Sequence, residues 1–344
     1  MPLLLKKAAW SVKGEDPPRR EGASNRVKIL FVTSNRIGDG VLSSGVLAHL
    51  LETAPNPRVT IACGPAPAPL FRAVPGLDRI VVMTKGRLGA HWRHLWMETA
   101  FHLWDLVVDL RASAISYLLP SRARIVYRPT HEPVHRVRQL GALVGRAANP
   151  PSPRLWLDHA ALAEGARLVP AGGAVLAVGP TANWAGKQWP ADSFVEAVAR
   201  LTAPDGFLPG ARVAVFGAPT ERAGAEPVLA TIPPERRLDC IGGGDLPAVG
   251  AALSRCAFYL GNDSGLMHMA AAAGIPTLGL FGPSNDALYA PWGPKAAFVR
   301  GNTGFWDIIG APAYDHASKT SLMGELDVDR VAAAAASLWK RVAP

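Results

Sequence analysis

Residues 258–285 read FYLGNDSGLMHMAAAAGIPTLGLFGPSN, and the fold of the chain follows from this stretch. A short apolar run at 258–260 stops at a turn, 261–265, that contains two glycines. Residues 267–273 contain no helix breaker and predict a helix that ends at the next glycine. A second apolar run at 278–281 stops at Gly-Pro-Ser-Asn. Two buried strands joined by one short helix form a parallel β-α-β unit.

The turn before this helix carries side chains suited to binding an anion. Ser264 and Gly265 stand at the mouth of the helix, where unpaired N–H groups and the helix dipole favour negative charge. Gly265 leaves the backbone open to a phosphate. His268 lies one turn in, on the face that looks back over the opening, and Asp263 is placed to cap the helix. We expect a diphosphate site here; the alternative is a capped helix with a partly buried histidine.

Three motifs together resemble one known family. Residues 263–284 match the pattern D-S-G-x-x-H-x-A-A-A-x-G-x-P-T-x-x-L-F-G-P-S, residues 184–190 match W-x-x-K-x-W-P, and residues 37–39 read I-G-D. The chain resembles glycosyltransferase family 9, the ADP-heptose:lipopolysaccharide heptosyltransferases, over roughly residues 27 to 340. The resemblance implies an α/β protein of GT-B type, with two Rossmann-like doubly wound parallel-sheet domains facing across a cleft.

The resemblance also implies roles for particular residues. Asp39 matches the proposed catalytic base of the family, and the alternative for it is a helix cap, because aspartate before a helix is common. Lys187 is expected to pair with a donor phosphate as a point charge, and the alternative is a surface lysine before a helix start. The full set of residues expected to bind the donor is Thr181, Lys187, Glu221, Asp263, Ser264, Gly265, Leu266 and His268.

The residues themselves predict a Rossmann-like start to each half of the chain. In the first half, a strand at 27–33, a turn at 34–40 and a helix at 41–52 succeed one another without the G-x-G-x-x-G fingerprint of dinucleotide binding. The turn instead presents Asp39 at the carboxyl end of the strand. In the second half, a strand at 174–178, a long turn at 179–190 and a helix at 191–201 repeat the pattern.

With 344 residues, of which 49% are apolar, the chain is long enough for two domains. We expect a disordered basic tail at 1–25, an acceptor-binding domain at 26–165 and a nucleotide-sugar-binding domain at 166–327. The last segment, 328–344, is expected to be a helix that crosses back to the first domain. Three scattered cysteines favour buried free thiols and a reducing compartment over a disulfide framework or a zinc site.

The positive charge of the chain is concentrated in its first half. Residues 1–160 hold 22 lysines and arginines against 11 aspartates and glutamates, whereas residues 161–344 hold 14 against 16. A basic half implies an acidic partner. We expect an anion-binding rim for the acceptor, and the alternative is a solvated basic face; the rim residues are Lys85, Arg87, Arg93, Arg122, Arg128 and Arg136.

These expectations combine into one hypothesis: an inverting glycosyltransferase that moves a sugar from a nucleotide-diphosphate donor to an acidic glycolipid or oligosaccharide acceptor. The family implies heptose, ADP and a lipopolysaccharide-core acceptor. No Asp-x-Asp pair stands in a plausible place, so we expect no metal and no cofactor. No apolar run is long enough to span a membrane. We expect a cytoplasmic monomer, peripheral at the inner membrane surface, that does not bind nucleic acid.

Two other classes of protein remain open at this point. A nucleotide- or nucleic-acid-binding protein of Rossmann-like fold without transferase activity would explain the charge, although the basic residues lack regular aromatic interleaving. A dehydrogenase would explain two Rossmann-like halves, but the glycine fingerprint is missing. A Ser-His-Asp hydrolase does not fit, because Asp263 and Ser264 are adjacent and no G-x-S-x-G elbow is present.

Overall fold

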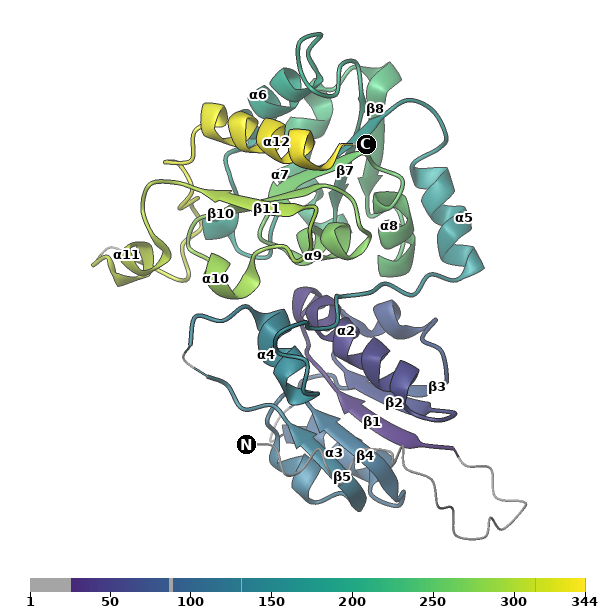
Figure 1. The fold of residues 1–344 in the computed structure, drawn as a ribbon. Helices are drawn as coiled ribbons and strands as arrows, with labels where there is room; N and C mark the ends of the chain where they lie inside the picture. The colour runs from purple at the N-terminus through teal and green to yellow at the C-terminus, as the bar shows by residue number, and fades with distance from the viewer. Residues whose placement is uncertain (1–25, 87–88, 131, 313, 344) are drawn as a thin grey trace. The chain divides into compact units, whose positions relative to one another are not determined.

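The computed structural model describes residues 26–86, 89–130, 132–312 and 314–343, and these form two compact units (Figure 1). The first unit comprises the described residues up to 132 together with 136–156. The second comprises 133–135 and the described residues from 157 onward. The predicted tail at 1–25 and Arg87 lie outside the described residues.

The first unit is built on a five-stranded parallel sheet with the order β3-β2-β1-β4-β5. The chain moves outward from β1 to β2 and β3, and then returns to the other side of β1 with β4. The strand order therefore reverses between β1 and β4, which is where doubly wound sheets bind their ligands. The elements are β1 (Lys28–Val32), α2 (Ile37–Thr53), β2 (Arg58–Cys63), η1 (Ala68–Phe71), β3 (Leu77–Val82), α3 (Ala90–Thr99), β4 (Trp104–Asp109), η3 (Ala114–Tyr117), β5 (Ser121–Val126) and α4 (Arg136–Leu143).

The second unit has a six-stranded parallel sheet with the order β11-β10-β9-β6-β7-β8, and its order reverses between β6 and β9. Its strands are β6 (Val175–Gly179), β7 (Arg212–Gly217), β8 (Arg237–Ile241), β9 (Phe258–Asn262), β10 (Thr277–Phe281) and β11 (Ala296–Arg300). Its helices are α5 (His159–Leu168), η4 (Ala185–Lys187), α6 (Ala191–Thr202), η5 (Pro219–Glu221), α7 (Arg222–Thr231), η6 (Pro234–Arg236), α8 (Leu246–Leu253), α9 (Gly265–Ala272), α10 (Asp286–Tyr289), α11 (Phe305–Gly310) and α12 (Val328–Val342).

Both faces of the second sheet are covered, so its central strands are buried throughout. Phe258 and Leu260 point to the face covered by α6, α7 and α12, where they join one large apolar core. Tyr259, between them, points to the other face, because successive side chains of a strand alternate. Two parallel sheets of this kind confirm the predicted fold class, and the helix α9 predicted between two buried strands is confirmed as well.

The structure differs from the sequence-based expectations, or adds to them, at three places in the chain. Helix α2 begins at Ile37, so Asp39 lies in its first turn rather than in a loop before it. Residues 90–99 form helix α3, which was not anticipated from the sequence. Helix α12 packs against α6, β10 and β11 of its own unit.

The boundary between the units also lies earlier than expected, between Trp156 and Leu157 instead of after residue 165. Helix α5 accounts for the difference, because it packs closely along α8 in the second unit. A Cβ atom on Gly165 of α5 would lie 2.5 Å from the Cβ of Ala251 on α8. Residues 147–153 therefore belong to the first unit, and α5 to the second.

Candidate active site

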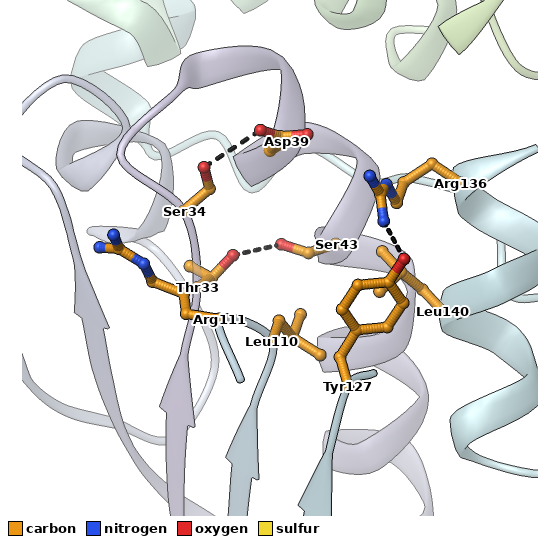
Figure 2. Close-up of a pocket in the computed structure, with 9 residues that line it drawn as sticks. All are labelled: Thr33, Ser34, Asp39, Ser43, Leu110, Arg111, Tyr127, Arg136 and Leu140. Carbon is orange, nitrogen blue, oxygen red and sulfur yellow. Dashed lines mark hydrogen bonds between the residues drawn. The ribbon is translucent and has the colours of Figure 1, made fainter. Parts of the chain in front are cut away.

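A cavity of about 230 Å³ opens at the carboxyl ends of β1 and β4, where the order of the first sheet reverses (Figure 2). Asp39 lines it from the first turn of α2, and the Ser34 hydroxyl donates a hydrogen bond of 3.1 Å to its Oδ2 atom. The hydroxyl groups of Thr33 and Ser43 lie 2.9 Å apart in the same wall. The lining residues are Thr33, Ser34, Asp39, Ser43, Leu110, Arg111, Tyr127, Arg136 and Leu140.

Two guanidinium groups give this cavity a positive character. Arg111 follows β4 in a turn shaped by the fully buried Asp109, whose Oδ1 atom accepts the Arg111 backbone N–H at 2.8 Å. The Arg111 side chain donates to Asn35 Oδ1 at 2.9 Å. Arg136 begins α4 and donates to the Tyr127 hydroxyl (Figure 2). One carboxylate beside two guanidinium groups is suited to an anionic substrate that must also give up a proton.

Of the residues expected in the acceptor rim, only Arg136 lines this cavity. Lys85 and Arg128 follow β3 and β5 and are exposed. They lie at the carboxyl ends of the strands, as Asp39 does. Arg93 is exposed on α3. Arg122 is the second residue of β5 and forms an ion pair of 3.3 Å with Asp105 near the start of β4. Because all five strands are parallel, Arg122 lies near their amino ends, whereas Asp39 lies at their carboxyl ends. Arg122 is therefore not part of this cavity.

The second sheet brings two of the predicted donor-binding residues together at the ends of β6 and β7. Thr181 is 2% exposed, and its hydroxyl donates to Glu221 Oε2 at 3.0 Å. The same carboxylate oxygen accepts the backbone N–H of Ala218 at 2.9 Å. The two residues are 40 positions apart in sequence, and they meet because β6 and β7 are neighbours in the sheet.

The other predicted donor-binding residues gather at the end of β9, across the reversal point from Thr181. Lys187 Nζ, from η4, lies 2.6 Å from Asp263 Oδ2. His268 is 5% exposed, and its Nε2 atom lies 4.0 Å from Asp263 Oδ1. Asp263 therefore pairs with Lys187 instead of capping the helix as expected. Ser264 is the N-cap residue of α9. The N–H groups at the start of this helix, at 264–266, therefore lie at the same end of β9.

This assembly depends on Asn262, which sequence reasoning missed. Asn262 is fully buried, and its Nδ2 group donates to the Pro180 carbonyl at 2.8 Å. Its Oδ1 atom accepts the backbone N–H of Trp189 at 3.0 Å. Both ends of the loop that carries Lys187 are thereby tied to β9. The sequence signal was present, because an asparagine that ends an otherwise apolar strand must find buried partners.

Comparison with known proteins decides the family. The model of glycosyltransferase family 9 (heptosyltransferase) matches residues 110–305, more than half of the chain. The chain belongs to glycosyltransferase family 9. It is 24% identical to lipooligosaccharide heptosyltransferase 2 of Haemophilus influenzae over 310 residues, which cover 80% of this chain and 88% of that protein.

Solved structures of the family share the fold of this glycosyltransferase. The structure of Escherichia coli ADP-heptose LPS heptosyltransferase II matches with a TM-score of 0.69 at 20% identity, over 91% of this chain and 98% of that one. Escherichia coli heptosyltransferase WaaC with ADP matches with a TM-score of 0.66 at 15% identity, over 89% and 98%. These matches extend over both units and support the GT-B assignment.

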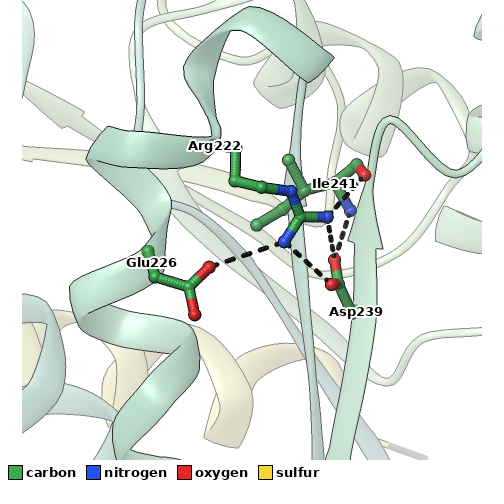
Figure 3. A network of polar contacts seen from close by, with 4 residues as sticks. All are labelled: Arg222, Glu226, Asp239 and Ile241. Carbon is green, nitrogen blue, oxygen red and sulfur yellow. Dashed lines mark hydrogen bonds and ion pairs between the residues drawn. The ribbon is translucent and has the colours of Figure 1, made fainter.

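In this glycosyltransferase, a polar network joins the start of α7, directly after Glu221, to β8 (Figure 3). Arg222, the next residue, forms an ion pair of 3.0 Å with Asp239 of β8 and donates to the Ile241 carbonyl at 3.1 Å. Burial raises the pKa of Asp239, but hydrogen bonds from Arg222 and from the Ile241 N–H outweigh burial and leave the pKa below its ordinary value. The network fixes the first turn of α7 on β8.

Two further observations concern only the described part of this glycosyltransferase. Within it, no group of three or more histidine, cysteine, aspartate or glutamate side chains is arranged to hold a metal ion. None of its helices is both long and apolar enough to cross a membrane. All three cysteines are buried free thiols, as the sequence predicted.

Proposed function

We propose that this glycosyltransferase transfers heptose from ADP-heptose to an acidic acceptor of the lipopolysaccharide core. The relatives named for this donor and this glycolipid support the choice of substrates. The observation that carries the proposal is the set of groups at the reversal point of the second sheet. The carboxyl end of β9 is lined there by Lys187, His268 and the N–H groups at the start of α9. The Thr181–Glu221 pair lies beside them.

The donor would occupy this edge with its diphosphate at the mouth of α9. The N–H groups of Ser264, Gly265 and Leu266 and the helix dipole favour an anion there. Lys187 has three N–H donors, so it can hold a phosphate oxygen while still contacting Asp263. Glu221 is an acceptor that suits the hydroxyl groups of a ribose.

The acceptor would occupy the cavity of the first unit. Arg111 and Arg136 can bind phosphate or carboxylate groups of the acceptor, because a guanidinium matches the geometry of these anions. Asp39 is the base that takes the proton of the reacting hydroxyl. Lys85, Arg93 and Arg128 remain candidates for longer-range attraction of an acidic glycan.

The reaction would be a single displacement. The acceptor oxygen bonds to the anomeric carbon as its proton passes to Asp39, and the bond from that carbon to the diphosphate oxygen breaks, so ADP leaves with the electron pair. The configuration at the carbon inverts. Negative charge that develops on the departing diphosphate is stabilised by Lys187, His268 and the first turn of α9. This scheme requires no metal ion.

The acceptor class also leads us to propose where the enzyme works. A lipopolysaccharide precursor is anchored in the inner membrane, so the enzyme would act as a monomer, peripheral at the cytoplasmic face. The excess of positive charge in residues 1–160 supports attraction to an anionic surface.

A thermal-shift panel tests the donor class. At a concentration of ADP about 100 times its Kd, binding adds about 2.7 kcal/mol to the stability of the folded state. This corresponds to a rise in melting temperature of several degrees. UDP, GDP and NAD should give much smaller shifts. Lys187→Ala should lose the ADP shift, whereas Lys340→Ala, an exposed lysine at the end of α12, should keep it. A larger shift with UDP or GDP would overturn the assignment of ADP.

A further inference from the structure

The inference concerns Trp92 of helix α3, whose indole ring lies against the guanidinium group of Arg111. The Arg111 Cζ atom is 5.0 Å from the centre of the ring, within the range of a cation–π contact. Trp92 stands three residues before the fully buried Leu95, so both side chains point from one face of α3 toward the sheet. Because α3 follows β3, its first turn lies at the carboxyl ends of the strands, where the cavity of the first unit opens.

The turn that carries Arg111 fixes the direction of its side chain. Ala112, the next residue, has a φ of 53°, a left-handed conformation that is unfavourable for alanine. The buried carboxylate of Asp109 holds the turn in this shape, because it accepts the backbone N–H groups of Arg111 and Ser113, each at 2.8 Å. Backbone strain of this kind persists only where the surroundings impose it, and it clusters at functional sites.

Asn35 restrains the guanidinium from a second side. Its Oδ1 atom accepts from Arg111 Nη1 at 2.9 Å. Gly64, after β2, leaves room for this amide, because a Cβ atom there would lie 2.8 Å from the same oxygen. Within the described residues, the Nε and Nη2 groups of Arg111 form no hydrogen bond with protein. The edge that carries these two groups matches the paired oxygens of a phosphate or a carboxylate.

Packing explains only part of what Trp92 does. Its side chain packs partly on the apolar core under α3, to which Leu95 belongs, and an aliphatic residue could fill that role. An aliphatic residue has no π face to attract a cation. A free arginine side chain loses rotamer freedom when it binds an anion, whereas a stacked one has already lost it. The indole therefore lowers the cost of binding an anion at Arg111.

We propose that Trp92 is a positioning residue for the acceptor, because it holds the Nε and Nη2 edge of Arg111 toward an anionic group of that substrate. This inference rests on the proposed function, since it assumes that an acidic acceptor occupies the cavity of the first unit. Trp92 acts through Arg111, which lines the cavity. Figure 2 shows Arg111 and Arg136 on opposite sides of this cavity, so we assign the two guanidinium groups to different parts of the acceptor.

Steady-state transfer from ADP-heptose to a lipopolysaccharide-core acceptor tests the role of Trp92. Trp92→Leu should raise the KM for the acceptor by about 3- to 30-fold, the effect of losing a cation–π contact, and change kcat by less than about twofold. The Kd for ADP should stay the same. Trp92→Phe keeps an aromatic face and should recover most of the acceptor affinity, which a loss of packing alone does not predict.

Trp96→Leu is the matched control for this substitution. Trp96 lies on the same helix and is 40% exposed, and its ring is 6.3 Å from that of Phe101 rather than over Arg111. The control should have the wild-type KM for the acceptor. Arg111→Ala should raise this KM, and adding Trp92→Leu to it should have little further effect, because the two residues act as one unit.

Two altered acceptors identify the anionic group, one without its phosphates and one with its carboxylates reduced to alcohols. Trp92→Leu should no longer raise the KM for the acceptor that lacks the group bound by Arg111. A wild-type KM in Trp92→Leu, an equal rise with all three acceptors, or additive losses in the double variant would overturn the inference and leave the proposed function standing. If the wild-type protein transfers nothing to the intact acceptor, both fail together.

Discussion

At the scale of single residues, charge pairing decides what each candidate side chain can do. Lys187 is 25% exposed and Asp263 only 8%, so the ammonium group is the member of the pair that solvent or a ligand can reach. Asp263 holds Lys187 in place and is itself sheltered. In the first unit, Ser34 similarly restrains Asp39 while the carboxylate remains open to the cavity. Each of these two candidate groups is thus held in place by a neighbour.

Replacement of Asp39 by asparagine tests the proposed base. The amide keeps the size of the side chain and can still accept from Ser34, but it cannot take a proton. The kcat for transfer should fall by about 100- to 10,000-fold, the usual contribution of a general base, while the Kd for ADP stays unchanged. Transfer from ADP-heptose to a lipopolysaccharide-core acceptor is the assay, and a chelator should not affect the wild type. A variant that turns over at the wild-type rate would exclude Asp39 as the base.

At the scale of elements, the candidate site residues of both sheets lie where the strand order reverses. Asp39 and Arg111 follow β1 and β4, and Thr181 and Asp263 follow β6 and β9. At these points the connections leave toward opposite faces of the sheet, which opens space at the carboxyl ends of the strands. The helices that cover the faces must pack closely for the strands to keep this arrangement, and α5 packs tightly against α8 at Gly165.

Gly165→Ala tests how closely these two helices pack. The new Cβ atom would lie 2.5 Å from the Ala251 Cβ and 2.8 Å from its carbonyl carbon, so the helices must separate. Overpacking of this kind should lower the free energy of unfolding by about 1–3 kcal/mol, despite the better helix propensity of alanine. Urea unfolding is the measurement. Gly173→Ala, where a Cβ atom meets nothing within 4 Å, should be neutral. Equal stability of the two variants would contradict the close packing.

At the scale of the whole molecule, the first unit contains one buried thiol and the second contains two. Burial raises the pKa of Cys63, in the first unit, and of Cys240, in the second, to about 12, and it raises the pKa of Cys256 as well. The ordinary value is 9.0. Below pH 9 both folded and unfolded chains keep the thiol protons, so the folded state has its full stability. Between pH 9 and pH 12 the unfolded chain loses protons that the folded chain keeps, and stability falls.

This loss can be measured for each unit. From pH 8 to pH 10, each thiol should cost about 1.4 kcal/mol of stability. Urea unfolding of the first unit should therefore show a loss of stability between pH 8 and pH 10. In Cys63→Ala this loss should be smaller by about 1.4 kcal/mol. Cys256→Ala should do the same for the second unit only. An unchanged pH dependence in both variants would show that the thiols do not control alkaline stability.

Much of the fold could be predicted from local sequence. The strands at 27–33 and 174–178 and the helix at 191–201 were placed within a residue, because a buried strand is a continuous apolar run and the helix that follows it has an apolar face. Helix α3 was missed because its sequence, AHWRHLWMET, begins after a glycine-rich basic segment and buries few residues. Asp39 was singled out from the sequence, but Arg111 and Tyr127, which line the same cavity, were not, since their positions depend on which strands are neighbours.

The sequence by itself determined the β-α-β unit at 258–285, the buried state of the thiols and the family. Each of these depends on residues close together in the chain or on the chemistry of one side chain. Only the tertiary structure decided that Thr181 meets Glu221, that Lys187 pairs with Asp263, and that Arg136 joins Asp39 while Arg122 lies at the far edge of the sheet. These outcomes depend on strand order and direction, and hydrogen bonds between parallel strands connect segments whose separation in sequence carries no local signal.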